Sequence, residues 1–182
     1  MSSIIVANSN PDYAKRIAAL LHSTGLYVAS VSTTGASVMD FAHRHYHGGV
    51  VVSSAKLRDM PAVNLPDVVP NYDFLFLMGS QFAQMCGRLG CASLILPVKR
   101  RDLVDTVNMF LNISGFTPLS VKKQLAAENF DEKAALKKAK ELLMVRNHFT
   151  EPQAHRFIQK KSMDTGKKTA ETSLIILNTL NT

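Results

Sequence analysis

The residues best suited to chemistry include a short run of histidines. His43, His45 and His47 alternate with Arg44 and Tyr46. His43 and His47 are four residues apart, which places both imidazoles on one face of a helix, where a metal ion can bridge them. The sequence offers no third ligand at a suitable spacing. A solvated helix end is the simpler interpretation, and we expect no metal site.

Other reactive side chains are equally sparse. Cys86 and Cys91 are the only cysteines, and they do not form a CxxC motif. In a chain of this composition we interpret them as packing residues rather than a disulfide or a reactive pair. The sequence contains no nucleophile–base pair and no phosphate-binding glycine loop. We therefore expect no enzyme activity and no cofactor.

Short apolar strands alternate with helical segments over the first 113 residues. The patterns predict strands over 4–7, 27–31, 50–52, 74–77 and 92–96. Helices are predicted after Pro11, after the capping residue Thr34, over 82–89 and over 103–111. Three prolines within residues 60–72 exclude a long helix there. This alternation predicts an α/β fold with a doubly wound, five-stranded parallel sheet.

The order of these elements resembles the receiver domain of two-component response regulators, which has a flavodoxin-like fold. The resemblance covers residues 3–113, and we assign residues 1–115 to this domain. Its landmarks are Pro11 after the first strand, the segment 57–60 after the third, and Pro97 after the fifth.

The residues that a receiver needs for phosphorylation are replaced. A receiver carries an acidic pair for Mg²⁺ after the first strand, an acceptor aspartate after the third and a lysine ending the fifth. The resemblance places Asn8 and Ser9, Ser54, and Leu96 at these positions. A Ser/Thr after the fourth strand falls near Met78 or Gly79. We therefore predict a degenerate pocket that a histidine kinase does not phosphorylate, and a domain that serves dimerisation or a protein partner.

Positive charge is concentrated in the last third of the chain. Residues 1–115 contain nine Lys and Arg against seven Asp and Glu, whereas residues 116–182 contain twelve against seven. The net charges are therefore +2 and +5 of the total +7. A locally basic segment indicates an acidic partner such as nucleic acid, or else a solvated helical surface.

Helical patterns continue beyond the connection at residues 115–118. One long helix is predicted over 119–146, and we expect it to link two copies of the chain as a coiled-coil homodimer. Thr150 and Gln153 form the capping box of a second helix, which Gly166 ends. Apolar residues over 169–177 predict a third helix. We assign residues 116–182 to this second, all-α domain.

Three motifs in this segment closely resemble the ANTAR domain. They are Ala139–Met144, Thr150–Ala154 and Ser162–Asp164, and the resemblance spans about residues 130–180. ANTAR domains bind paired RNA hairpins and prevent a transcription terminator from forming, and they are commonly fused to receivers. Two positions depart from the family pattern. Ser162 replaces the usual alanine, and the usual glycine before the second helix is absent.

The resemblance and the local excess of basic residues predict an RNA-binding surface. Basic residues would meet phosphates, while a histidine, an amide or an arginine plane would contact splayed bases. The candidates are Lys137, Lys140, Arg146, His155, Arg156, Gln159, Lys160, Lys161, Lys167 and Lys168. We assign a second group to the core rather than to contacts: Ala139, Leu143, Met144, Ala154 and Met163.

These features predict a cytoplasmic RNA-binding transcription antiterminator that acts on hairpin loops of a nascent leader transcript. The apolar run at residues 4–7 is too short for a signal peptide or a membrane span. Two alternatives remain open. Three helices with a basic face also suit a DNA-binding regulator, and a merely solvated basic face suits a protein-interaction adaptor.

Overall fold

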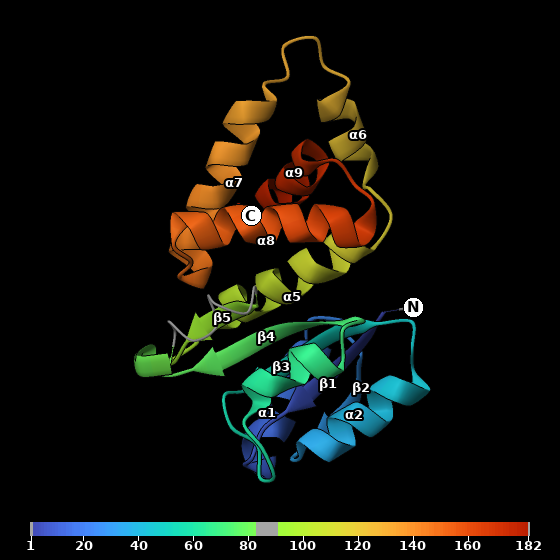
Figure 1. Cartoon of the computed structure of the whole chain (residues 1–182), viewed down its shortest axis with the longest axis vertical. Coiled ribbons are helices and arrows are strands. Elements are labelled where there is room, and N and C mark those ends of the chain that lie inside the picture. The colour runs from blue at the N-terminus through green and yellow to red at the C-terminus, as the bar shows by residue number, and fades with distance from the viewer. Residues whose placement is uncertain (1, 83–90, 182) are drawn as a thin grey trace. The chain divides into compact units, whose positions relative to one another are not determined.

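The computed structural model describes residues 2–82 and 91–181 and divides into two compact units, residues 1–104 and 105–182 (Figure 1). The division falls inside helix α5 (Arg100–Ser114), whereas the sequence placed it after residue 115. The last ten residues of α5 pack with the helices that follow them, as shown by the contact between Phe110 and Phe157. The rest of α5 belongs to the N-terminal unit.

The N-terminal unit contains the predicted five-stranded parallel sheet. The strands are β1 (Ser3–Ala7), β2 (Val28–Ser32), β3 (Gly49–Ser54), β4 (Tyr72–Met78) and β5 (Ala92–Ile95). Their spatial order is β2-β1-β3-β4-β5, so the chain reverses direction across the sheet after β2. In such a sheet the crevice at the carboxyl ends of the strands is the usual place for a ligand.

Alternate residues of each strand supply the two layers of the core, because successive side chains of a strand point to opposite faces. Ile5, Val51 and Phe74 pack on one face with Val38 of α2 (Gly35–Arg44). The buried small residues of α1 (Pro11–His22) include Ala14 and allow close packing of that helix. The near-continuous apolar strands are those expected of a sheet covered on both faces.

Local signals for the first two helices are confirmed. The Asn10 side chain accepts hydrogen bonds from the backbone N–H groups of Asp12 and Tyr13, and Pro11 begins α1. The Thr34 hydroxyl accepts from the Ser37 N–H and begins α2. Side-chain caps of this kind satisfy N–H groups that have no partner within the helix.

The proline-rich segment forms no long helix. It contains a 3₁₀ turn, η1 (Ala62–Asn64), and the single helical turn α3 (Leu65–Val68). A second 3₁₀ turn, η2 (Ser80–Phe82), follows β4. Most of the helix predicted over 82–89, together with Cys86, lies outside the described residues, whereas Cys91 is buried.

The C-terminal unit adds α6 (Leu119–Leu125), α7 (Glu132–Asn147), α8 (Glu151–Thr165) and α9 (Thr169–Leu180) to the end of α5. Within this unit, α6 and α7 lead to and from one loop, and α8 crosses in front of α9 (Figure 1). α9 packs against α6, α7 and α8. Buried Leu143, Ile158 and Ile176 supply apolar side chains from three different helices.

The single long helix expected over 119–146 is instead two helices joined by residues 126–131. The Asp131 side chain accepts hydrogen bonds from the N–H groups of Lys133 (2.9 Å) and Ala134 (3.1 Å), and so it begins α7 anew. Because both α6 and α7 pack on α9 of the same chain, the continuous coiled-coil helix proposed for dimerisation is not formed.

The start and the end of α8 follow the predicted signals. Gln153 Oε1 accepts a hydrogen bond from the Thr150 N–H at 2.7 Å, which is the reciprocal bond of a capping box. Gly166 ends the helix at a φ of 67°. At the end of α7, where the ANTAR pattern has glycine, His148 takes the left-handed conformation with a φ of 57°.

The predicted core of this unit is confirmed in part. Ala139, Leu143 and Ala154 are fully buried. Met144 and Met163 are not core residues: 37% of Met144 and 82% of Met163 are exposed. The apolar periodicity on which both were assigned does not distinguish an inward helix face from its edge, and the packing of α9 selects the face that is buried.

Candidate functional site

The predicted pocket positions lie at the carboxyl edge of the sheet, at the ends of neighbouring strands. Ala7 pairs with Ser53, so Asn8 and Ser54 follow at adjacent ends of β1 and β3. The Ser54 hydroxyl donates to the Lys56 carbonyl at 2.8 Å. At β5, the Leu96 N–H donates to the Met78 carbonyl and its side chain is exposed. Within the described residues, these receiver positions therefore hold neither carboxylate ligands nor an ammonium group.

Asp59, a carboxylate in the loop that follows β3, has a structural partner. Asp59 accepts hydrogen bonds from the backbone N–H groups of Gly35 (2.7 Å) and Ala36 (3.0 Å), in the first turn of α2. These two bonds, that to Ala36 first, hold the pKa of the Asp59 carboxyl below its ordinary value. Next to it, Arg58 Nε donates to the Ser9 carbonyl at 3.0 Å. Both side chains tie the loop after β3 to neighbouring segments.

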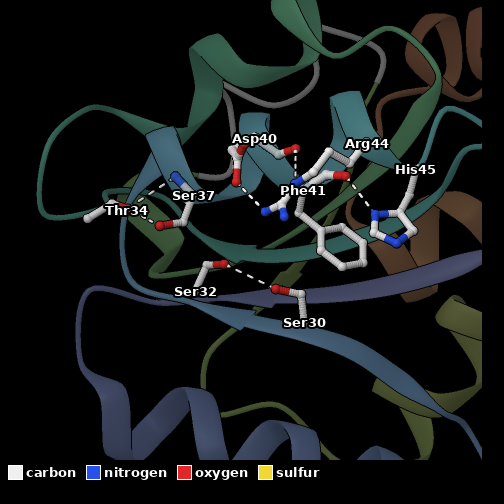
Figure 2. Close-up of polar contacts among 8 residues, drawn as sticks. All are labelled: Ser30, Ser32, Thr34, Ser37, Asp40, Phe41, Arg44 and His45. Atoms are coloured by element: carbon white, nitrogen blue, oxygen red, sulfur yellow. Dashed lines mark hydrogen bonds and ion pairs between the residues drawn. The ribbon is translucent and has the colours of Figure 1, made fainter.

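The histidine segment lies at the end of α2 and shows internal contacts. His45 stacks on Phe41 with ring centroids 4.0 Å apart, and its Nδ1 lies 3.0 Å from the Phe41 carbonyl oxygen (Figure 2). Arg44 and Asp40 form an ion pair beside it (Figure 2). Among the described residues, no group of three His, Cys, Asp or Glu side chains is arranged to hold a metal ion.

Three of the predicted RNA-binding cations have partners inside the C-terminal unit. Arg146 forms an ion pair with Asp105 (2.6 Å) and donates to the Leu180 carbonyl (3.1 Å). The Lys167 ammonium donates to the carbonyls of residues 113 and 115, at 2.9 and 2.8 Å. These bonds place a positive charge at the C-terminal end of α5, where it is favourable. Lys161 is buried, with its ammonium 5.7 Å from the centroid of the Phe110 ring.

Two further cations form ion pairs at the surface. Lys140 Nζ lies 2.7 Å from the Glu151 carboxylate, which lowers the pKa of Glu151 through the hydrogen bond and the charge. Lys160 lies 3.3 Å from Asp164, one helical turn along α8. Exposed pairs of this kind are screened by water and contribute little to stability.

The remaining candidates form the outer surface of the unit. Lys137 on α7, Arg156 and Gln159 on α8, and Lys168 at the start of α9 are exposed, and His155 is half-buried. Sequence reasoning missed two exposed lysines on α7, Lys133 and Lys138. We define the exposed basic surface as the exposed cations of these three helices: Lys133, Lys137, Lys138, Arg156, Lys160 and Lys168.

A comparison with known protein families matches the helices that carry the exposed basic surface. Residues 125–176 match the family model of the ANTAR domain. The match covers α7, α8 and most of α9, which together hold the exposed basic surface. None of the curated proteins compared with the chain matches it.

Solved structures resemble the chain in fold. The isolated receiver domain of RcsB from Salmonella enterica serovar Typhimurium is 14% identical, with a TM-score of 0.53 over 67% of this chain and 96% of that one. The NarL receiver domain from Mycobacterium tuberculosis is 16% identical, with a TM-score of 0.52 over 58% and 92%. RcsB, in a structure of two dimers on two parallel DNAs, is 13% identical, with a TM-score of 0.55 over 99% and 98%.

The chain therefore combines a receiver-fold unit with a helical unit that follows it in the sequence. Residues 125–176 of the C-terminal unit match the ANTAR domain, and the N-terminal unit has the fold of a receiver domain. In the part of the chain that the structure describes, no helix has the length and apolarity needed to cross a lipid bilayer.

Proposed function

We propose that this protein is a cytoplasmic, non-catalytic transcription antiterminator that binds hairpin loops of a nascent leader transcript. ANTAR domains are RNA-binding antitermination modules, and the ANTAR match is the observation that carries the proposal. Bound protein would stabilise the hairpins that compete with a terminator, so that transcription continues. The contribution of the protein is binding energy, and no bond needs to be made or broken.

The exposed basic surface supports this role. Lys137, Arg156 and Lys168 come from three different helices of the ANTAR match and are all exposed. A polyanion that contacts several of them gains an interaction that weakens as salt is added. Arg146 instead joins α7 to α5 and α9, whereas Lys161 and Lys167 contact α5, and we assign all three a structural role.

We further propose that the receiver-fold domain is not phosphorylated on aspartate. Asn8 and Ser54 supply no carboxylate, and Asp59 is engaged with the first turn of α2. Without an acidic pair, these receiver positions lack the carboxylate groups through which proteins usually bind Mg²⁺. The domain would then act through a protein partner or through dimerisation. Since α6 and α7 are separate helices, a homodimer would use a surface other than a continuous coiled coil.

A DNA-binding regulator is the second candidate, because the fold of RcsB, described in complex with DNA, covers nearly the whole chain. That likeness is 13% identical for one complex and 12% for the other, and it concerns the fold alone. The ANTAR match concerns the helices that carry the basic surface, and it favours RNA.

The test uses the full-length protein and RNAs that it selects from a pool of two-hairpin leaders with randomised loops. Binding of a selected RNA and of duplex DNA is measured from about 50 to about 200 mM salt. We expect RNA-selective, salt-sensitive binding without a phosphodonor. Preference for duplex DNA would support the second candidate, and absence of salt-sensitive binding to either would support an adaptor.

A charge-matched pair of variants assigns the surface. Replacing Lys137, Arg156, Lys160 and Lys168 with Gln is expected to weaken RNA binding and to reduce the salt slope by roughly one for each cation that meets a phosphate. The control carries the same charge change on the N-terminal unit: Lys15, Arg16, Lys56 and Lys99 to Gln. Equal effects of the two variants would mean that only net charge matters.

Incubation with acetyl phosphate, followed by mass spectrometry, tests the absence of aspartyl phosphate.

A further inference from the structure

Met163 is an apolar side chain on the otherwise polar outer face of α8. It is 82% exposed, and Gln159 and Lys160, about one helical turn earlier, are exposed as well. Single exposed apolar residues are common on protein surfaces, so exposure alone does not define a site. The surroundings of Met163 add a second observation.

Met163 lines an open hollow of about 740 Å³ where the end of α8, the turn at Gly166 and the start of α9 meet. A Cβ atom added to Gly166 would meet no atom within 4 Å, so the turn leaves this side of the hollow free. The volume lies within the range of about 300–1,000 Å³ found for sites that bind small organic ligands. The lining residues are Glu132, Gln159, Ser162, Met163, Gly166, Lys167, Lys168, Thr169 and Ala170.

The lining combines one apolar surface with polar groups at its margin. Met163 is the only large apolar side chain among the described residues that line it. Gln159 offers an amide that both donates and accepts hydrogen bonds, and Glu132 offers a carboxylate acceptor. Lys168 is exposed beside them and belongs to the exposed basic surface. A ligand that suits this lining has a flat apolar face, a polar edge and a negative charge nearby.

We propose that this hollow binds one unpaired base of the RNA loop, with Met163 packed against the face of the base. The inference rests on the proposed RNA-binding function and assigns a base-contacting role within it. The Met thioether is polarisable and packs well against aromatic rings. Gln159 meets the polar edge of the base, and Lys168 meets an adjacent phosphate.

The chemistry of the hollow favours a base over an apolar peptide side chain. A peptide anchor is typically held by several apolar or aromatic walls, whereas the described lining has a single large apolar side chain among polar and small residues. Unpaired RNA bases are splayed from the loop and are recognised by packing on a side chain and by hydrogen bonds to their edges. The neighbouring cations are complementary to the RNA backbone.

The experiment measures RNA affinity of Met163→Ala in the full chain with the selected two-hairpin RNA. Removing one base-packing side chain is expected to weaken binding roughly tenfold, as for other side chains that stack on bases. The salt slope should equal that of the unchanged protein, because no phosphate contact is removed. This combination differs from the basic-surface variant, in which the slope itself falls. An unchanged circular dichroism spectrum shows that the variant is folded.

Met144→Ala is the matched control, since Met144 is also a partly exposed methionine but lies on α7 outside the hollow. The RNA affinity of Met144→Ala should remain within about twofold of the parent, because this variant keeps Met163 in the hollow. Met163→Leu should retain most of the affinity, because leucine is also an apolar side chain.

RNAs with 2-aminopurine at one loop position at a time provide a second readout. One position should change fluorescence on binding to the parent but not to Met163→Ala. RNA binding by the parent with equal affinity for Met163→Ala would overturn this inference alone, whereas no RNA binding by the parent would overturn the proposed function as well.

Discussion

The Ser162 and Thr172 hydroxyl oxygens lie 2.9 Å apart in a buried hydrogen bond that joins α8 to α9. Ser162 is the residue that departs from the alanine of the ANTAR pattern, and Thr172 is fully buried opposite it. The Ser162 hydroxyl also lies 2.8 Å from the Ile158 carbonyl oxygen of its own helix. The departure therefore introduces a polar group whose partners are in place.

Ser162→Ala should lower the free energy of unfolding by about 1 kcal/mol, because it leaves the buried Thr172 hydroxyl without this partner. The double variant Ser162→Ala, Thr172→Val should lose less than the sum of the two single variants. Urea unfolding of all four proteins completes the cycle. Additive losses would show that the two hydroxyls do not interact.

The end of α5 should be required for the C-terminal unit to fold. Asp105 pairs with Arg146, and Phe110, 1% exposed, contacts Phe157. A fragment of residues 105–182 should unfold cooperatively, whereas residues 116–182 should show reduced helicity by circular dichroism. Phe110→Ala in the full chain should cost about 3–5 kcal/mol through the cavity it leaves. Identical melting of the two fragments would contradict this expectation.

Asp59 should contribute a pH-dependent part of the stability. Its pKa is lowered in the folded chain from an ordinary value of 3.8, so its contribution is fully present above pH 3.8 and is lost as the pH falls through the lowered pKa. Urea unfolding between neutral pH and about pH 3 should therefore show a steeper decline for the parent protein than for Asp59→Asn. Parallel curves would mean that the bonds to Gly35 and Ala36 do not depend on the charge.

His148→Gly should stabilise the protein. The positive φ of His148 costs about 1 kcal/mol for a residue with a side chain, and the greater freedom of glycine in the unfolded chain offsets part of that gain. We expect a net increase of about 0.5 kcal/mol in the free energy of unfolding. As a control, His43→Gly, within helix α2, should destabilise by about 0.3 kcal/mol, the difference between the helix propensities of histidine and glycine. A loss of stability for His148→Gly would indicate that the imidazole makes a compensating contact.

Local signals in the sequence were sufficient for much of the fold. The strands, the caps at Thr34 and Thr150 and the end of α8 at Gly166 depend on residues within a few positions of one another. The break before α7 was also signalled locally, by Asp131 followed by Glu132, but the strong helix formers on both sides concealed it.

The roles of the cations depended on contacts that no local pattern contains. Lys167 donates to carbonyls more than 50 positions earlier, and Arg146 pairs with Asp105 on a different helix. A lysine looks the same in a sequence whether its ammonium meets water or a carbonyl. The sequence therefore predicted a basic segment, but it did not distinguish the exposed cations from those with partners inside the unit. The exposure of Met163 could not be predicted for a related reason, because helical periodicity does not specify which neighbouring element covers a helix face.

The internal partners of Arg146, Lys161 and Lys167 change what the charge of the C-terminal third means for a polyanion. A cation releases a counterion from a nucleic acid only when it reaches a phosphate. Three of the twelve basic residues between 116 and 182 are engaged within the unit, so fewer ions are displaced than the composition implies. A larger share of the selectivity for one RNA over another must then come from the shape of the loop and its bases.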